Sequence, residues 1–502
     1  MKPLISKGIS IALLGVLFLT IFNFTLTNMA APYIAGSLGA SNDIATYTIT
    51  FFALGNAMGL PLSRICSVKF GSVVFLIICL LLFAIFSYLC TVSTSYAQIV
   101  VTRFFQGFAA GPLFPLVGRI LSSLNAPEKK QSTSTCIILI SAITPVFGAS
   151  WGGCIAYEYH WNWIFYLNLP FLILLTPIFY FTLKDKPIEI PDCAFNPVGY
   201  ISYCSWVLCL GSAITLGQFL DWHRSSIIIA LFAVGIFSFF FYVLWDLKHP
   251  HPIIHLQLFK KFSFSLAMTS LAGLFSAYFG MVLLLGLWLT LDVNYTPLWI
   301  ALLIGSMSFA GLVLSFLIPT LERMDPRIPL CIAVVFFAVS CFYSTNFSVD
   351  INFGRIATSR ILAGFGLAFF LAPLFRMAFA SLNHEETNDG VVIFQIVRSI
   401  SSGLGASIYT TVWWRRSVFF YERLGSDLTA FSQETKFYFG KAAFFDIKGL
   451  KADAKLQDLL SKQAKALALD DSFYLMAWVC VILLIGILLT LLRKTPLIEK
   501  ST

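Results

Sequence analysis

The sequence predicts an all-α polytopic membrane protein built from two related halves. Of its 502 residues, 58% are hydrophobic and only 11% are charged, whereas a soluble domain carries about 25% charged residues. Apolar stretches of roughly 20 residues, the length that a membrane helix needs, recur along the whole chain. In the first half Arg103 precedes Gly107 by four residues, and Arg360 and Gly364 repeat this spacing in the second half. We therefore expect two halves around one shared site.

Fourteen membrane helices follow from these stretches. The expected spans are 8–30, 44–64, 71–92, 97–118, 131–157, 163–183, 199–220, 225–246, 264–291, 297–319, 327–347, 355–380, 389–413 and 473–492. Residues 1–186 would form an N-terminal six-helix bundle, 187–262 a linker with an inserted helix pair, and 263–502 a C-terminal six-helix bundle.

A polar outer loop over 414–472 is expected before the last span. Leucines at 456, 459, 460 and 467 recur there at helical spacing, which indicates an amphipathic helix. We expect this helix to dock on its own bundle.

The positive charges predict the orientation in the membrane. With the N-terminus inside, 18 of the 33 lysines and arginines fall in inner loops and termini, and only Arg224 and Arg355 fall in short outer loops. Because cytoplasmic loops are enriched in Lys and Arg, we expect a protein of the cytoplasmic (inner) membrane with both termini in the cytoplasm. The net charge of +9 is then a topology signal, and no nucleic-acid partner is implied.

The sequence contains no recognisable motif of an enzyme active site or a metal-binding site. Its eleven cysteines and six histidines show neither a disulfide framework nor metal-ligand spacing. A nucleophile elbow, a phosphate loop and a zinc-protease motif are all missing from the sequence. We therefore expect no enzyme, no metal and no cofactor.

The first span carries the polar residues Asn23, Thr25 and Asn28, followed by Pro32. So many polar groups in one membrane helix favour a face directed at the bundle interior or a cavity. Together with residues 34–41 (IAGSLGAS) they resemble the fourteen-helix drug:proton antiporters of the major facilitator superfamily, the EmrB/QacA type. That family carries an aspartate, thought to bind a proton, at the position of Asn23.

Further motifs extend this resemblance over almost the whole chain. The basic turn after the second span keeps only Lys69 and Gly71, without the acid of the family pattern. The other matching positions are Arg103, Gln106 and Gly107 in the fourth span, Gly148, Gly152 and Gly153 in the fifth, and Gln395 and Arg398 in the thirteenth. Arg360 in the twelfth span is the internal counterpart of Arg103. The candidate substrate or coupling residues are Asn23, Thr25, Asn28, Arg103, Gln106, Arg360, Gln395 and Arg398, and the candidate gating or packing residues are Lys69, Gly71, Gly107, Gly148, Gly152 and Gly153. Most of the glycines are interpreted as helix-packing residues, and for Arg398 a packing role, paired with helix carbonyls, is the preferred alternative.

The resemblance implies a major facilitator fold, two six-helix bundles plus an inserted helix pair, working by alternating access. It also implies a lipid-embedded monomer that exports lipophilic, often cationic drugs in exchange for protons, with a periplasmic adaptor as in related efflux systems.

The residues themselves raise alternatives for the substrate. The sequence places no carboxylate or histidine deep in any expected span, whereas Arg103, Arg360 and Arg398 lie within spans. Because guanidinium groups pair with carboxylates, an anionic or polycarboxylate metabolite such as a siderophore, moved with weak or no proton coupling, is an equal hypothesis. In a further alternative Arg103 is satisfied by Asn23, Gln106 and helix carbonyls. A third class is a membrane receptor or scaffold without transport; neither the substrate nor the direction of transport follows from the sequence.

Overall fold

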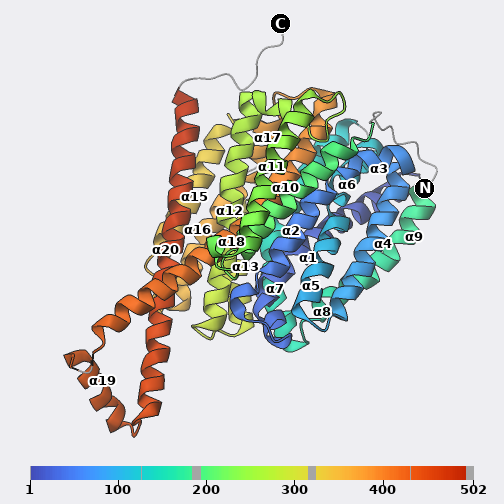
Figure 1. The fold of residues 1–502 in the computed structure, drawn as a ribbon. Coiled ribbons are helices and arrows are strands. Elements are labelled where there is room, and N and C mark those ends of the chain that lie inside the picture. The colour runs from blue at the N-terminus through green and yellow to red at the C-terminus, as the bar shows by residue number, and fades with distance from the viewer. Residues whose placement is uncertain (1, 126, 184–193, 315–323, 430, 493–502) are drawn as a thin grey trace.

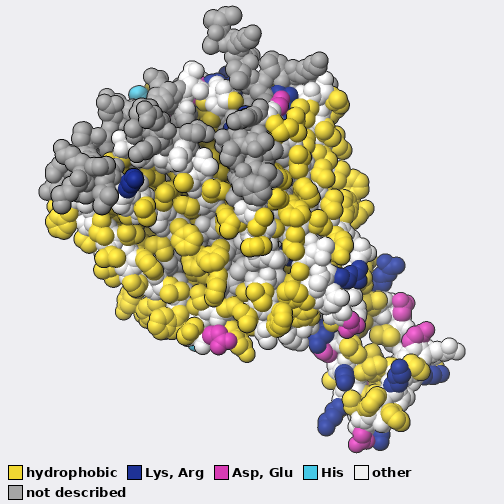
Figure 2. All heavy atoms as spheres, turned by 180° about the vertical axis from the view of Figure 1, so that it is seen from behind, with side chains coloured by type: hydrophobic (Ala, Val, Ile, Leu, Met, Phe, Trp, Pro, Cys, Tyr) yellow, Lys and Arg dark blue, Asp and Glu magenta, His cyan; other side chains and the backbone are white. Residues whose placement is uncertain are grey.

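The computed structural model describes residues 2–125, 127–183, 194–314, 324–429 and 431–492, and these residues form helices and connecting turns without any strand. Within them, 13 helices are long and apolar enough to cross a membrane, or up to 14 if one bent helix pair is counted as a single span. The predicted all-α polytopic fold is confirmed. Hydrophobic side chains cover most of the body in Figure 2, as expected of a surface that faces lipid.

The first six spans are formed by nine helices. They are α1 (Lys2–Ser37), α2 (Tyr47–Gly59), α3 (Leu62–Phe70), α4 (Ser72–Thr91), α5 (Tyr96–Ala110), α6 (Leu113–Leu124), α7 (Pro127–Glu158), α8 (Trp163–Tyr166) and α9 (Asn168–Leu183), with a 3-10 turn η1 (Asn42–Ile44) before α2. The second expected span is bent by 49° between α2 and α3. Pro61 stands at that break, where proline cannot continue the backbone hydrogen bonds of the preceding helix.

The remaining helices form the inserted pair and the second half. The pair consists of α10 (Pro197–Leu216) and α11 (Ser226–Lys248), with the 3-10 turns η2 (Trp222–Arg224) between them and η3 (Leu256–Lys260) after them. The second half contains α12 (Phe262–Leu291), α13 (Pro297–Leu314), α15 (Arg327–Ser344), α16 (Phe353–Ala368), α17 (Leu371–Phe379), α18 (His384–Asp427), α19 (Gln433–Phe444) and α20 (Leu450–Leu492). Of the expected tenth span, 297–319, the part after Leu314 lies outside the described residues.

Helix packing repeats between the two halves. In the first half α1 packs on α7, α2 on α5, α4 on α5 and α4 on α9; in the second half α12 packs on α18, α13 on α16, α15 on α16 and α15 on α20. The arginine-bearing helices α5 and α16 therefore occupy equivalent places. The halves meet along two seams, where α2 packs on α18 and α7 packs on α13.

The inserted pair covers one of these seams. Helix α10 packs on both α2 and α18, and its Tyr203 hydroxyl donates to the carbonyl of Ala57 in α2 at 2.8 Å. Asn196 caps its N-terminus by accepting from the Gly199 amide at 3.0 Å, and such a cap satisfies a backbone donor that would otherwise stay unpaired. The pair thus contacts both halves at once.

The segment 414–472, expected as an outer loop, is largely helical. Helix α18 continues to Asp427 and α20 already begins at Leu450, and Figure 1 shows them leaving the body as two extensions joined by α19, at the opposite end from the two chain ends. We call residues 414–472 the arm. The expected amphipathic helix exists within α20. It packs mainly on α18, because the polar stretches of both helices extend past the apolar part together, and it reaches the body only at its end nearest the membrane, through Lys465 and Asp292.

Two ion pairs hold the base of the arm. Arg416 of α18 contacts Asp471 of α20 at 2.5 Å, and Lys465 contacts Asp292, just beyond the end of α12, at 2.7 Å. Burial raises the pKa of the Asp292 carboxyl, and the hydrogen bond and charge of Lys465 oppose that shift. The arm is therefore anchored to the second half.

Candidate functional site

A small central cavity of about 50 Å³ lies between the first half and α18. Its lining residues are Leu17, Thr20, Ile21 and Phe24 of α1, Phe52, Asn56 and Leu60 at α2, Ala110, Gly111 and Phe114 at α5 and α6, and Gln395, Arg398, Ser399 and Ser402 of α18. Both halves contribute to this wall, as expected for a transporter whose halves move around a fixed site. This volume has room for a few water molecules and is well below that of pockets that enclose drug-sized ligands, so the cavity must widen to admit a substrate.

Apolar rings dominate one side of the cavity. Phe24 stacks on Phe52 with ring centroids 5.1 Å apart and on Phe279 at 5.5 Å, and Phe275 continues this stack. The Arg398 guanidinium lies at the end of this stack, 5.3 Å from the Phe275 ring, and 5.8 Å from the Phe114 ring. The cavity therefore joins an aromatic surface to one positive charge.

The unpaired polar atoms of the lining are hydrogen-bond donors. Within the described part of the chain, Nη1 of Arg398 and Nε2 of Gln395 are buried without a partner. The hydroxyls of Thr20, Ser399 and Ser402, by contrast, already donate to backbone carbonyls. Because a buried donor without an acceptor is costly, this surface is complementary to a ligand that brings acceptors.

Acidic groups are missing from this cavity: the described lining residues include no Asp, Glu or His. Gln395 and Arg398 were both expected as substrate or coupling residues, and the structure brings them together on one face of α18. The positive side chain of the lining is Arg398 rather than Arg103.

Arg103 lies outside the cavity lining, fully buried in a hydrogen-bonded network. Its Nη1 donates to Asn23 Oδ1 at 2.9 Å and to Gln106 Oε1 at 2.7 Å, and its Nη2 donates to Thr27 Oγ1 at 3.0 Å. Its Nε donates to the Thr48 carbonyl at 3.3 Å, and the Phe52 ring lies 4.2 Å from the guanidinium. This geometry corresponds to the alternative in which Asn23, Gln106 and a helix carbonyl satisfy Arg103.

Thr25 and Asn28, the other expected site residues of the first span, do not line the central cavity. The Thr25 hydroxyl donates to the Ile21 carbonyl at 3.0 Å and lies against Gly148 of α7. Asn28 is buried as well. A Cβ on Gly152 would overlap the Leu26 carbonyl oxygen, so the lack of a side chain there allows α7 to approach α1. Gly153 faces Met29 in the same interface, and Gly107 of α5 lies against the Phe52 carbonyl of α2.

Arg360, the counterpart of Arg103 in α16, is bound differently. It is fully buried, and its Nη2 donates to Ser344 Oγ at 3.1 Å and Ser359 Oγ at 2.9 Å. Its Nε and Nη1 have no partner among the residues that the structure describes. Arg360 does not line the central cavity.

The basic turn after the second span forms the end of α3. Lys69 lies in its last turn with its ammonium 5.4 Å from the Phe70 ring, and Gly71 links α3 to α4 with a φ of 84°. That backbone conformation favours glycine. Neither residue reaches the central cavity.

A polar contact joins the halves on the arm side of the cavity. Thr50 of α2 hydrogen-bonds to Ser407 of α18 at 2.8 Å and donates to the Gly403 carbonyl at 3.1 Å. Ser407 also contacts Thr215 of α10 at 3.4 Å. Both halves and the inserted pair thus meet in one hydroxyl cluster.

Sequence reasoning missed several of these residues. Asn56, Phe114, Ser399 and Ser402 line the cavity, yet single aromatic or small polar residues in a span give no signal of their own. Ser399 and Ser402 could have been found from their position next to Arg398 on one helix face.

Comparisons with known proteins agree with this architecture. The sequence pattern of the Major Facilitator Superfamily matches residues 13–406. The chain is 27% identical over 478 residues to the "Multidrug export protein EmrB" of Escherichia coli (strain K12), covering 95% of this chain and 93% of that protein. It is 28% identical over 416 residues to the "Fatty acid resistance protein FarB" of Neisseria gonorrhoeae, covering 83% and 82%. A bacterial homologue of the lysosomal transporter Spinster shares the fold with a TM-score of 0.62 at 15% identity, covering 97% of each chain.

Proposed function

The chain belongs to the Major Facilitator Superfamily, and from this premise we propose that it exports small amphipathic anions from the cytoplasm through its central cavity. It is a multi-pass transporter of the inner membrane, similar to multidrug exporters. Its chemistry is alternating access to one site between two halves, without a catalysed reaction.

The set of unpaired donors at the cavity supports an anionic substrate. Arg398 Nη1 and Gln395 Nε2 need acceptors, and a carboxylate, sulfonate or similar group would supply them. Hydrogen bonds to a charged group contribute about 1.5–3 kcal/mol each. A cation would meet the Arg398 charge without any acid to offset it, so the geometry favours anions over the cationic drugs that the family resemblance implied.

The rest of the cavity supports an amphipathic molecule with a single negative end. Phe24, Phe52 and Phe114 offer apolar contact, whereas Arg103 and Arg360 are held away from the lining. A polycarboxylate siderophore would need several such partners and fits less well. FarB, by its name a fatty acid resistance protein, is a relative whose substrates would have the proposed character.

Flux into proteoliposomes tests this proposal with a matched pair of ligands. We expect an arylalkyl sulfonate to be transported and the quaternary ammonium compound of the same skeleton to be excluded, because only the sulfonate satisfies Arg398 and Gln395. The sulfonate is permanently charged, so it neither leaks as a neutral acid nor carries a proton. Preferred transport of the ammonium compound would refute the proposal, and no saturable flux of either would favour a receptor or scaffold.

Weak proton coupling is part of the same proposal. The family's aspartate is replaced by Asn23, whose amide oxygen accepts from Arg103 and which does not titrate. We expect an imposed pH gradient to change the sulfonate flux little. Gradient-driven accumulation of the sulfonate would contradict this part.

The charge distribution supports a cytoplasmic location of both chain ends, with the arm on the periplasmic side. Both chain ends lie toward the end of the body opposite the arm (Figure 1). The inner loops and termini hold 18 Lys and Arg against two in the short outer loops, and the ten in the arm are not counted because long segments do not follow the charge rule. An arm in the periplasm would be placed to contact an adaptor, while the transporter itself acts as a monomer.

Exposed aromatic side chains at the end of the arm support this partner. Phe437 and Phe444 of α19 are 66% and 85% exposed, and Phe431 and Phe445 beside this helix are 86% and 71% exposed. Figure 2 shows hydrophobic side chains on the arm between charged ones. Exposed aromatic residues are typical of interaction sites.

We expect cells that carry the double variant Phe437→Ser and Phe444→Ser to lose most of their resistance to a toxic anionic substrate. The purified variant should still transport the sulfonate into proteoliposomes at the wild-type rate. Removing two aromatic contacts weakens an interface by roughly 30-fold or more. The matched control is Lys436→Ser with Lys441→Ser on the same helix, which should lose little. A cysteine at Gln433 should react with an impermeant maleimide from outside the inner membrane. Equal losses in cells and proteoliposomes, or protection of that cysteine, would contradict the assignment.

A further inference from the structure

A second pocket lies at the base of the arm, on the arm side of the central cavity. It has a volume of about 20 Å³, which has room for about one water molecule, and we call it the outer pocket. Its wall includes Thr46 and Tyr47 at the start of α2, Phe219 at the end of α10, and Ser407 and Trp414 of α18. The first half, the second half and the inserted pair therefore meet around it.

The seam between α2 and α18 connects the two pockets. Ser399 lines the central cavity and donates to the Ala53 carbonyl at 2.9 Å, whereas Ser407 lines the outer pocket and bonds to Thr50 at 2.8 Å. Gly403 stands midway, four positions from each serine, on the helix face that this spacing defines. A Cβ there would lie 2.6 Å from the Ala53 Cβ, so the glycine lets the two helices approach closely. A path from one pocket to the other follows this line.

The hydroxyl cluster of Thr50, Ser407 and Thr215 closes this path in the structure. Thr50 also donates to the Gly403 carbonyl at 3.1 Å, and Ser407 contacts Thr215 of α10 at 3.4 Å. All three hydroxyl-bearing side chains are buried. Hydrogen bonds between membrane helices are individually weak, so the seam can part here and close again, which a barrier in a transport cycle requires.

The inserted pair is bonded to the first half more firmly than to α18. The hydroxyls of Tyr200 and Tyr203 donate to carbonyls of α2 at 3.0 and 2.8 Å. Toward α18, the hydroxyl contact of Thr215 is 3.4 Å long, and the bond from Arg415 to Gln218 is exposed. When the seam parts, α18 therefore separates from α2 and α10 together, and α10 becomes one wall of the opened seam.

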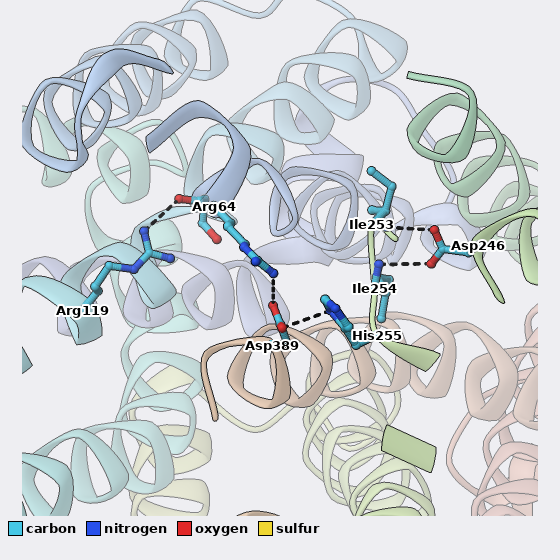
Figure 3. Close-up of polar contacts among 8 residues, drawn as sticks. Arg64, Arg119, Asp246, Ile253, Ile254, His255 and Asp389 are labelled. Atoms are coloured by element: carbon cyan, nitrogen blue, oxygen red, sulfur yellow. Dashed lines mark hydrogen bonds and ion pairs between the residues drawn. The ribbon is translucent and has the colours of Figure 1, made fainter. Parts of the chain in front are cut away.

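The far end of the inserted pair is held as well. Asp246 at the end of α11 accepts from the Ile253 and Ile254 amides at 2.8 and 3.2 Å (Figure 3). These bonds fix the chain where it leaves the inserted pair and turns toward α12. The pair thus has a firm base from which α10 can form a wall.

The outer pocket attracts an anion less than the central cavity does. Its described lining residues include no Lys, Arg or His, and the charged side chain among them is the carboxylate of Asp43. The rings of Tyr47, Phe219 and Trp414 still offer contact to the apolar part of an amphipathic molecule. An anion that moves from Arg398 to this pocket loses its positive partner, so its affinity falls toward the arm, as release requires.

We propose that the outer pocket is the site from which the exported anion is released, and that the inserted pair forms one wall of its exit route. The anion leaves the central cavity along the α2–α18 seam after the hydroxyl cluster has opened. It then reaches the base of the arm, where the Lys465 ammonium of α20 lies 5.7 Å from the Trp414 ring. The inference rests on the proposed function for the substrate and its direction, and it gives the inserted pair a part in release.

Labelling of a cysteine in the central cavity tests the barrier without any substrate. Ser402→Cys is treated with an impermeant maleimide from outside the inner membrane, and its labelling is counted above that of the native cysteines. Thr50→Val removes bonds between α2 and α18 and should speed this labelling about three- to ten-fold. The matched control is Thr290→Val on α12, because the Thr290 hydroxyl donates to the Gly286 carbonyl of its own helix at 2.8 Å. Equal rates in both valine variants would refute the route.

Filling the outer pocket tests the exit itself. Thr411 of α18 lines this pocket and is half-buried, so Thr411→Trp places an indole there. We expect the sulfonate to raise the melting temperature of this variant as much as that of the wild type, because its binding site in the central cavity is unchanged. The sulfonate flux in proteoliposomes should fall by about tenfold or more, since blocked release limits the whole cycle.

The other seam between the halves provides the matched control. Pro297 and Gly305 of α13 lie against α7, and Ala301 stands four positions from each on the same helix face. Ala301→Trp places the same side chain in the α7–α13 seam, away from the inserted pair, and should keep most of the flux. Equal flux in both tryptophan variants, or loss of flux in Ala301→Trp alone, would overturn the exit route.

Failure of the anion proposal would be seen separately from failure of the route. If the wild type transports the ammonium compound instead of the sulfonate, the anion proposal fails, and the two tryptophan variants are compared with the ammonium compound. If neither compound moves, the labelling of Ser402→Cys still decides whether the α2–α18 seam is the outer barrier.

Discussion

Arg398→Gln is expected to weaken the binding of amphipathic anions by on the order of 100-fold. Leaving one member of a buried, hydrogen-bonded charge pair without its partner costs about 2–5 kcal/mol, and each 1.4 kcal/mol is about tenfold in affinity. Arg398 is the positive side chain of the described cavity lining, and its Nη1 has no acceptor within the described residues. The measurement is the concentration dependence of sulfonate flux in proteoliposomes.

Two further variants make this result specific. Arg398→Lys keeps the charge but loses the planar fork that can bind two oxygens, so we expect an intermediate loss. Arg415→Gln is the matched control, since Arg415 lies on the same helix but bonds to Gln218 at 2.6 Å outside the central cavity. If Arg398→Gln transports the sulfonate as well as Arg415→Gln does, Arg398 is a packing residue and the anion site lies elsewhere.

Much of the architecture could be predicted because membrane helices are specified locally. A run of apolar residues must form a helix in lipid, so the inserted pair expected at 199–220 and 225–246 was found as Pro197–Leu216 and Ser226–Lys248. The arm could not be predicted from the same rule. Its polar stretches satisfy their backbone by continuing α18 and α20 beyond the apolar part, and only the packing of these two helices on each other decides that outcome.

The sequence predicted several residues of the candidate site but not their contacts or roles. The sequence identified Arg103 and Arg398 as buried charges, but their roles depend on contacts across the fold. Thr27 and Thr48 complete the network of Arg103, whereas the aromatic neighbours of Arg398 leave one nitrogen unpaired. Likewise, the local sequence could not predict that Arg64 of α3 donates to the Asp389 carboxylate of α18 at 2.8 Å (Figure 3), because 325 positions separate the two residues.

Arg103→Met is expected to destabilise the fold by about 2–4 kcal/mol. Hydrogen bonds between membrane helices average about 0.6 kcal/mol, bonds to a charged group are stronger, and this substitution removes four of them. It also leaves the Asn23 and Gln106 acceptors buried and removes the contact with the Phe52 ring. Thermal unfolding of the purified protein measures the effect.

Asn23→Asp should shift the melting temperature in the opposite direction. Its amide nitrogen is buried without a partner among the described residues, and a carboxylate would instead give the buried guanidinium a counter-charge at the 2.9 Å contact. Because this network lies outside the cavity lining, a folded Asn23→Asp protein should keep its anion flux, and so should the fraction of Arg103→Met that folds. An Arg103→Met protein that melts like the wild type but transports nothing would show that Arg103 acts on the substrate or on coupling, as the sequence alone suggested, and would remove the basis for assigning anion binding to Arg398.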